Sequence, residues 1–310
     1  MPFDFTAVSS PFRMQPGLRR LAAGAQQLTP NRLGDRALVE KLAVLATHAD
    51  QALLSADGFD ATPSLHALAT HAAAEHPDAF AWDGADHWQA HHLGWSLQCG
   101  TPVGDGPAEV GTCLRALPAT WRTAALLALA FAEDFAVIDG ATARIPWLAV
   151  CLPSHWAPED KIGRHFAQVH APVADNQMLI TASDHLARLV TGTERWERFV
   201  WTITHRPTLS QHPRRCDTAP WPGDANAGAL AALAFFRTER QTFIPLPAHS
   251  QAIFTIHVEM QPLAQAIALP AHASQLHAAL ASMSPAVLAY RGLTGVRDRL
   301  LVWLAMRAGT

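Results

Sequence analysis

A change in hydrophobic periodicity near residue 130 restricts the folds that this chain can adopt. Before that point, apolar residues recur at helical spacing, as Leu38, Leu42 and Leu45 do within residues 35–54. After it, short stretches alternate between apolar and polar residues, most clearly in 252–259. The spacing predicts helices over residues 35–54, 64–75, 86–97 and 118–131, so we expect the first 130 residues to be mainly helical.

The rest of the chain predicts two strands, then helices, then three strands. Residues 134–138 and 144–152 are typical of a hairpin, because Asp139-Gly140 between them is a strong turn signal. Helices are expected over 158–168 and 177–190, and strands over 198–204 and 252–259. Residues 230–242 are apolar but alanine-rich, so they fit either a helix or a strand. Helices over 270–282 and 295–308 are expected to close the chain.

We therefore expect an α+β fold formed as one continuous domain of residues 1–310. Its parts would be a helical region of about residues 1–130, a sheet-containing core of about 131–260 and C-terminal helices of about 261–310. The order of elements in the core is that of a PAS domain, which is a five-stranded antiparallel sheet whose helices enclose a ligand cavity.

Charge and cysteine content exclude several classes of protein. The net charge of −3 indicates no affinity for nucleic acid or an anionic membrane. The most apolar stretch, residues 124–131, is far shorter than the roughly 20 residues that a membrane-spanning helix needs. Residues 1–10 lack the pattern of a secretory signal. The four cysteines form no CxxC pair, which fits a reducing compartment, so a cytoplasmic protein is expected.

Motifs for common enzyme chemistries are missing from the sequence. It contains no GxSxG nucleophile elbow, no Walker A sequence and no GxGxxG fingerprint. His87, His91 and His92 include a pair four residues apart, a spacing found in metal sites on helices. Trp88 stands where a metalloprotease has its glutamate, so a solvated helix face is the better interpretation.

One segment carries a longer pattern. Residues 151–173 read CLPSHWAPEDKIGRHFAQVHAPV. This resembles a segment of the haem-dependent oxidative N-demethylase-like family in which a strand ends at Pro-Ser-x-Trp, a Lys-x-Gly step follows and an Ile/Val-His-x-Pro-Val motif closes a helix. The matching residues are Pro153, Ser154, Trp156, Lys161, Gly163, Val169, His170, Pro172 and Val173.

Further matches follow in the family's order over nearly the whole chain. They are the opening motif of residues 11–18, the acidic pair Glu133-Asp134, the arginine-rich motif of residues 237–242 and the closing Tyr290-Arg291-Gly292. The sequence departs from the family pattern at Ala174-Asp175, where another proline is usual, at Val200 in place of asparagine, at His155 and at Arg291 in place of lysine.

The resemblance implies a haem b cofactor and names candidate residues for it. His170 is expected to be the axial iron ligand, with His165 and His185 as alternatives. A ligand histidine presents one ring nitrogen to iron while a hydrogen bond orients the other. Trp156, Lys161 and Arg164 are expected to contact the haem, the two cations through its propionates. The alternative for both cations is an exposed helix face.

Arg237 and Glu239 are the predicted catalytic pair. Alternate strand residues point to the same face, so both side chains are expected to enter the pocket, where they would polarise bound oxygen or hold an amine. An ion pair at a solvated strand edge is the alternative.

The function implied by the resemblance is oxidative N-demethylation of a small secondary amine such as dimethylamine. The reaction would use O₂ and electrons from reductase subunits that carry flavin and iron–sulfur centres. A haem sensor without catalytic activity, or a small-ligand-binding protein that has lost catalysis, is the alternative.

Overall fold

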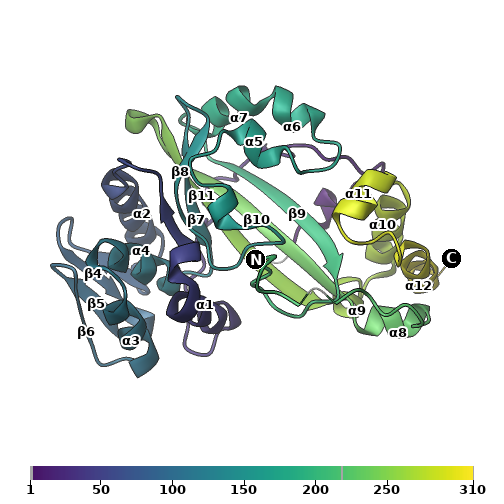
Figure 1. The fold of residues 1–310 in the computed structure, drawn as a ribbon, viewed down its shortest axis with the longest axis horizontal. Coiled ribbons are helices and arrows are strands. Elements are labelled where there is room, and N and C mark those ends of the chain that lie inside the picture. The colour runs from purple at the N-terminus through teal and green to yellow at the C-terminus, as the bar shows by residue number, and fades with distance from the viewer. Residues whose placement is uncertain (1–2, 218, 310) are drawn as a thin grey trace.

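A seven-stranded antiparallel sheet forms the centre of the molecule. The computed structural model describes residues 3–217 and 219–309. The strand order is β1-β9-β10-β11-β7-β8-β2, and Figure 1 shows helices packed around this sheet and at both of its ends. The strands are β1 (Arg19–Arg20), β2 (Leu53–Ser55), β7 (Asp134–Asp139), β8 (Arg144–Ala149), β9 (Trp196–Thr204), β10 (Phe235–Leu246) and β11 (Gln251–Pro262).

The predicted α+β class is confirmed, whereas the predicted number of strands is not. The two short strands at the edges, β1 and β2, come from the first 60 residues and extend the five strands that the periodicity indicated. β1 pairs with β9 through Arg19 and Arg20, and β2 pairs with β8. Segments of two or three residues are too short to show a periodicity, so they depend on their partner strands.

The expected hairpin at Asp139-Gly140 is present between β7 and β8. Its left-handed residue is Ala143, with φ of 52°, rather than the glycine. Gly140 is required for another reason, because a Cβ at this position would lie 2.1 Å from the hydroxyl of Thr191. Asp139 accepts hydrogen bonds from the backbone and hydroxyl of Thr142, which closes the turn.

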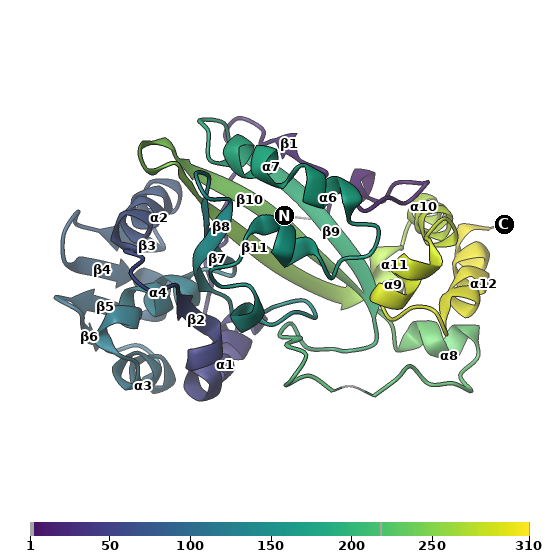
Figure 2. The same ribbon diagram turned by 45° about the horizontal axis from the view of Figure 1, so that its top comes forward.

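The prediction of a mainly helical first 130 residues is wrong for residues 80–104. These residues form a second, four-stranded antiparallel sheet, visible in Figures 1 and 2 beside α2 (Thr62–Glu75) and α4 (Ala119–Ala130). The expected helix over 86–97 is replaced by β4, a 3₁₀ turn and β5, which is possible because Gly94 adopts φ of 66°. The strands are β3 (Phe80–Trp82), β4 (His87–Ala90), β5 (Trp95–Gln98) and β6 (Thr101–Gly104).

The expectation that His87, His91 and His92 lie on a solvated helix face is therefore wrong. His87 lies in β4, and the other two lie in the 3₁₀ turn His91–Leu93. Burial along β4 alternates, with Trp88 and Ala90 buried and the intervening residues half-buried, which is the period of a strand.

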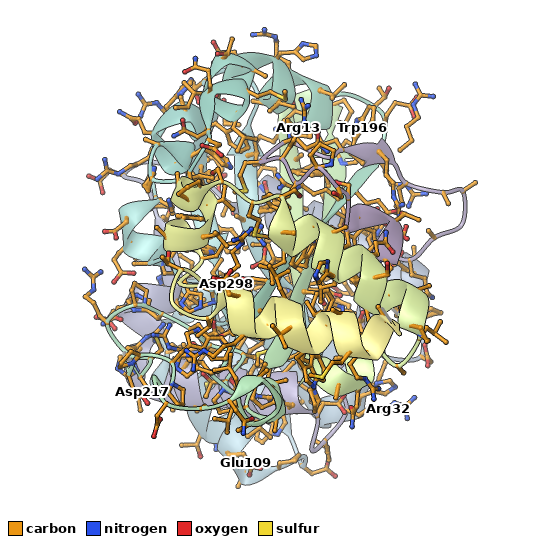
Figure 3. All side chains as sticks on the ribbon, turned by 90° about the vertical axis from the view of Figure 1, so that its right-hand side faces the viewer. Arg13, Arg32, Glu109, Trp196, Asp217 and Asp298 are labelled. Carbon is orange, nitrogen blue, oxygen red and sulfur yellow. The ribbon has the colours of Figure 1, made fainter. Side chains whose placement is uncertain are left out.

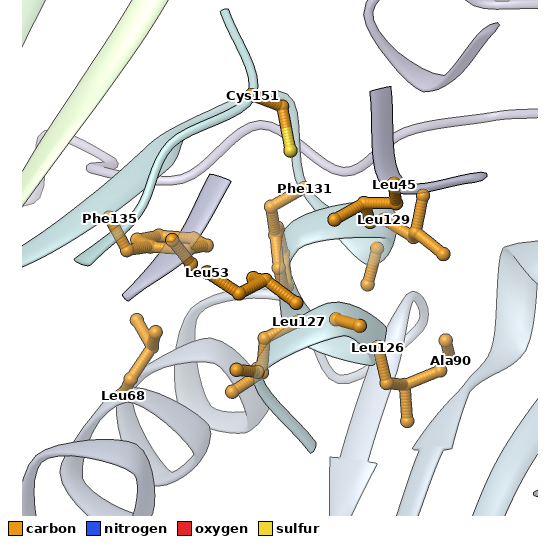
Figure 4. Close-up of a cluster of buried hydrophobic side chains, with 14 of the residues drawn as sticks. Leu45, Leu53, Leu68, Ala90, Leu126, Leu127, Leu129, Phe131, Phe135 and Cys151 are labelled. Carbon is orange, nitrogen blue, oxygen red and sulfur yellow. The ribbon is translucent and has the colours of Figure 1, made fainter. Parts of the chain in front are cut away.

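The main hydrophobic core lies between the first helices and the sheet. Leu45 and Leu68 from two of these helices meet Leu126, Leu127 and Phe131, all of them nearly inaccessible to solvent (Figure 4). The helices are α1 (Arg36–Ala52), α2 (Thr62–Glu75), α3 (Ala108–Ala116) and α4 (Ala119–Ala130).

A second core lies at the opposite end of the sheet, where Phe236 and Ile203 pack against C-terminal helices. Figure 3 views this end, with α12 in front beginning near the labelled Asp298. The helices are α8 (Ala227–Ala232), α9 (Leu263–Ala266), α10 (Pro270–Ala281), α11 (Pro285–Tyr290) and α12 (Arg297–Ala308). The ambiguous residues 230–242 are thus divided between the end of α8 and the first half of β10. Within the described ranges, no helix is both long and apolar enough to cross a membrane.

Three short helices cover one face of the sheet, and Figure 1 shows them together above β9 and β10. They are α5 (Phe166–His170), α6 (Gln177–Thr181) and α7 (Ser183–Val190). The expected helix over 158–168 is wrong, because this segment contains only a 3₁₀ turn, Pro158–Asp160, and the start of α5. Gly163, with φ of 68°, separates the two, and His165 caps α5.

Candidate functional site

The candidate site lies between α5–α7 and the sheet face beneath them. Its apolar wall is formed by Phe254 of β11 together with Trp156, Ile162 and Val169, which pack around a small buried cluster from β7 and β8. Val169 is the fourth residue of α5, so this contact fixes the short helix on the sheet and determines where its last residue, His170, lies.

His170 has the geometry of a preorganised ligand. Its ring nitrogen Nδ1 lies 2.8 Å from the carbonyl oxygen of Phe166, so Nδ1 carries the proton and donates it. The ring of Phe166 packs against the imidazole, with 4.3 Å between the centroids. No described residue forms a hydrogen bond with Nε2. Burial lowers the pKa of His170 to about 4, with the carbonyl of Phe166 opposing the shift and nearby Arg198 and Lys161 adding to it. The ring is therefore neutral near pH 7.

The two alternative histidines have other positions. The Nδ1 of His165 accepts the backbone N–H of Ala167 at 3.2 Å, and its Nε2 lies 2.9 Å from Asp184. Both of its nitrogens are thus used to cap α5 and to join it to α7. His185 is exposed on α7. Of the three candidates, only His170 combines an oriented ring with a ring nitrogen that no described residue engages.

Arg237 and Glu239 lie on the same face of β10, as the alternation predicted. Ser154 joins them: its hydroxyl accepts a hydrogen bond from Nε of Arg237 at 2.8 Å and donates one to Glu239. Arg237 is 1% exposed, and its guanidinium also donates to the carbonyl oxygens of Leu152 and Thr208. Burial lowers its pKa to about 10. The pair is therefore buried, and the strand-edge alternative is excluded.

Glu239 is the acidic group of this arrangement. Besides the bond from Ser154, its carboxylate accepts one from Gln241, the next residue on the same strand face. It also contributes an electrostatic attraction to Arg198 on β9, which raises the pKa of Arg198 against the effect of burial. One carboxylate is thus held near two arginines.

The other predicted cofactor contacts are only partly brought together. Trp156 is half-buried in the apolar wall. Lys161 donates from Nζ to the carbonyl oxygen of Val169 at 2.6 Å, and burial lowers its pKa. Its charge thus lies at the end of α5, close to His170. Arg164 is exposed, and its proposed contact remains a prediction.

Two residues of the site were not among the predicted site residues. Arg198 has a buried Nε with no hydrogen-bond partner in the described ranges. Strand alternation from Val200 would have placed Arg198 on the pocket face. His155 has φ of 61° and accepts a hydrogen bond from Arg206 at 3.0 Å. Burial lowers its pKa to about 4, and Arg206 adds to the shift. No local pattern indicates a left-handed histidine.

The residues present suit an iron porphyrin. A neutral imidazole with an available Nε2 fits an axial ligand, the Trp156–Phe254 wall fits an apolar macrocycle, and the unpartnered Nε of Arg198 fits a carboxylate.

Comparison with known families agrees with this chemistry. The model of the family described as haem-dependent oxidative N-demethylase, alpha subunit-like, matches residues 36–301. The match includes every strand of both sheets except β1, together with every residue of the candidate site, and leaves out residues 1–35 and 302–310. We conclude that this chain belongs to the haem-dependent oxidative N-demethylase alpha subunit-like family.

Proposed function

We propose that this chain binds haem b between α5–α7 and the sheet, with His170 as the axial ligand of the iron. The observation that carries the proposal is the hydrogen bond from Nδ1 of His170 to Phe166, which leaves a neutral ring with an available Nε2. Trp156 supplies part of the apolar wall, and Lys161 supplies positive charge near the ligand. The five inner strands with their covering helices would then act as a PAS-type haem-binding core.

We propose further that the chain is the haem subunit of an oxidative N-demethylase that acts on a small secondary amine. Such an amine is a cation near neutral pH, so it needs an anionic partner. Glu239 is the carboxylate of the predicted pair, and Ser154 and Gln241 hold it in place. Glu239 would bind the ammonium group and accept its proton, because only the neutral amine has a lone pair to give up during oxidation.

The remaining chemistry needs a cofactor and a partner. Haem supplies the oxygen chemistry when it is bound. With dimethylamine, O₂, two electrons and two protons give methylamine, formaldehyde and water. Electrons would come from a reductase that carries flavin and iron–sulfur centres, which agrees with the family's description as an alpha subunit. The role of Arg237 is to hold Ser154, and through it Glu239, in position.

The test is the absorption spectrum of protein purified from cells supplied with iron and a haem precursor. We expect a Soret band at near-stoichiometric haem that is lost in His170→Ala and kept in His185→Ala, the matched control, because His185 is exposed on α7. Dimethylamine should perturb the band in the wild type and much less in Glu239→Gln. A colourless wild type that also takes up no added haem contradicts the proposal. A Soret band without formaldehyde production, when a reductase is supplied, favours the sensor alternative.

A further inference from the structure

A second feature of the molecule is a pocket of about 270 Å³ at the β9 edge of the sheet. It lies between the N-terminal segment of residues 6–19, β9 and α6. Aromatic rings and arginines dominate its lining, and no aspartate or glutamate of the described ranges lines it. The aromatic and charged residues are Phe12, Phe199, Trp201, Arg13, Arg19, Arg198 and Arg291.

Not all of these arginines are available. Arg19 forms ion pairs with Asp4 and Glu197, so its charge is already compensated. Arg13 is exposed at the surface, where solvent screens it. Arg198 and Arg291 differ from both, because each is at least partly buried and neither has a carboxylate within ion-pair distance in the described part of the chain.

Arg291 is held by stacking rather than by an acid. Its guanidinium carbon lies 4.5 Å from the ring centroid of Phe12 and 5.1 Å from that of Trp201. One nitrogen donates to the carbonyl oxygen of Trp201, and another contacts the sulfur of Met14 at 3.9 Å. Burial lowers the pKa of Arg291 to about 10.

Arg198 of β9 lines the same pocket. Its buried Nε has no hydrogen-bond partner among the described residues, and burial lowers its pKa. A buried cation without a partner is unfavourable, because it has lost its hydration without gaining an equivalent interaction. Arg198 gains only an electrostatic attraction to Glu239, and Arg291 only contacts with rings and a carbonyl oxygen. Two incompletely compensated cations therefore face one aromatic pocket, which suits a ligand of opposite charge.

We propose that Arg198 and Arg291 form a carboxylate-binding site, and that Phe12, Phe199 and Trp201 contact the apolar part of the ligand that carries the carboxylate. Arginine suits this task because its planar guanidinium binds a carboxylate through two parallel hydrogen bonds. The three aromatic rings exclude water and so strengthen those bonds.

The carboxylate has two possible sources. Arg198 also acts electrostatically on His170, so the pocket adjoins the candidate haem site. The first source is a propionate of haem, and this alternative rests on the proposed function. The second is a separate ligand with its own carboxylate, such as an N-methylated amino acid. The proposal of a carboxylate-binding site holds for either source.

The experiment titrates phenylacetate, and its uncharged analogue phenylacetamide, into the purified protein by isothermal titration calorimetry. We expect phenylacetate to bind at least about tenfold more tightly than the amide, the ratio that one charge-assisted hydrogen bond supplies. Arg198→Gln should remove this preference. Arg188→Gln is the matched control, because Arg188 is exposed on α7 and does not line the pocket.

Haem loading then identifies the source. If haem abolishes phenylacetate binding and haem dimethyl ester does not, the site holds a propionate. If the haem-loaded protein still binds phenylacetate, the site serves a separate carboxylate ligand. Equal binding of acid and amide by the wild type, or no binding of either, overturns the proposal. The comparison of the two probes on the wild type does not depend on whether a variant folds, and it stands even if the protein takes up no haem.

Discussion

Replacing Lys41 by methionine should destabilise the fold strongly, because this lysine is a fully buried cation. Its side chain is 0% exposed, and Nζ donates to the carbonyl oxygens of Ala128 and Phe131 at 3.0 Å each and of Glu133 at 2.6 Å. Nζ also lies 3.3 Å from the carboxylate of Asp134, which is 1% exposed. The lysine thus ties α1 to the junction of α4 and β7.

The expected loss follows from what the substitution leaves behind. Methionine fills most of the volume, so the cavity contribution is small, but the buried carboxylate of Asp134 loses its counter-charge. Removing one partner of a buried ion pair costs about 3–5 kcal/mol. Burial already raises the pKa of Asp134, and this carboxyl will take up a proton when Lys41 is absent, which limits the loss to that range. The total stability of a domain is typically about 5–15 kcal/mol, so the variant should remain marginally folded.

The assay is urea denaturation at 25 °C, followed by far-ultraviolet circular dichroism. The matched control is Arg36→Met on the same helix, since Arg36 pairs with Glu40 at 3.0 Å at the surface and its loss should cost only about 0.3–0.5 kcal/mol. The double variant Lys41→Met/Asp134→Asn should recover part of the loss, because it removes the uncompensated charge. A loss below about 1 kcal/mol for Lys41→Met would refute the reasoning.

Three further outcomes are expected. The unfolded form of His170 binds a proton near pH 6.5 and the folded form near pH 4, so stability should fall as the pH drops through this window, by up to about 1.4 kcal/mol per pH unit from this residue. His170→Gln should remove that component, and an unchanged pH profile in urea denaturation would argue against a buried neutral ring. Ser154→Ala should cost about 1–3 kcal/mol, because Arg237 loses an acceptor, and a midpoint equal to the wild type would count against the bridge. Gly111→Ala should cost about 1–3 kcal/mol despite the helix propensity of alanine, since its Cβ would lie 2.1 Å from the ring of Trp95; a raised melting temperature in calorimetry would contradict this.

Local sequence patterns correctly predicted those helices and strands that bury one periodic apolar face. The helix predicted over residues 35–54 is α1, and the alternation at 252–259 is the middle of β11. They succeeded because a single amphipathic face recurs at the period of the element. The prediction of a helix over residues 86–97 was wrong. The few apolar residues there fit the period of a helix as well as that of a strand, and only Gly94 and the pairing with neighbouring strands select the strands.

The candidate site shows the same division. The motif in residues 151–173 named Ser154, Lys161 and His170 before any geometry was known, and the strand period placed Arg237 and Glu239 on one face. The sequence left three histidines as candidate ligands, because each occurs in or near the same covering segment. In the structure, hydrogen bonds involve both ring nitrogens of His165 but only one of His170, and this difference is the reason for proposing His170.

Residue type, local periodicity and short motifs were sufficient to predict the α+β class and the family, and to name His170, Arg237 and Glu239 as candidate site residues. The bridge that Ser154 forms between Arg237 and Glu239, across more than 80 residues of chain, is visible only in the folded molecule. The same holds for the position of Arg198 and Arg291 in one pocket that no aspartate or glutamate of the described residues lines. The physical reason is that hydrogen bonds and charge compensation depend on distances between segments, and no local pattern encodes which distant groups meet or which remain unpaired.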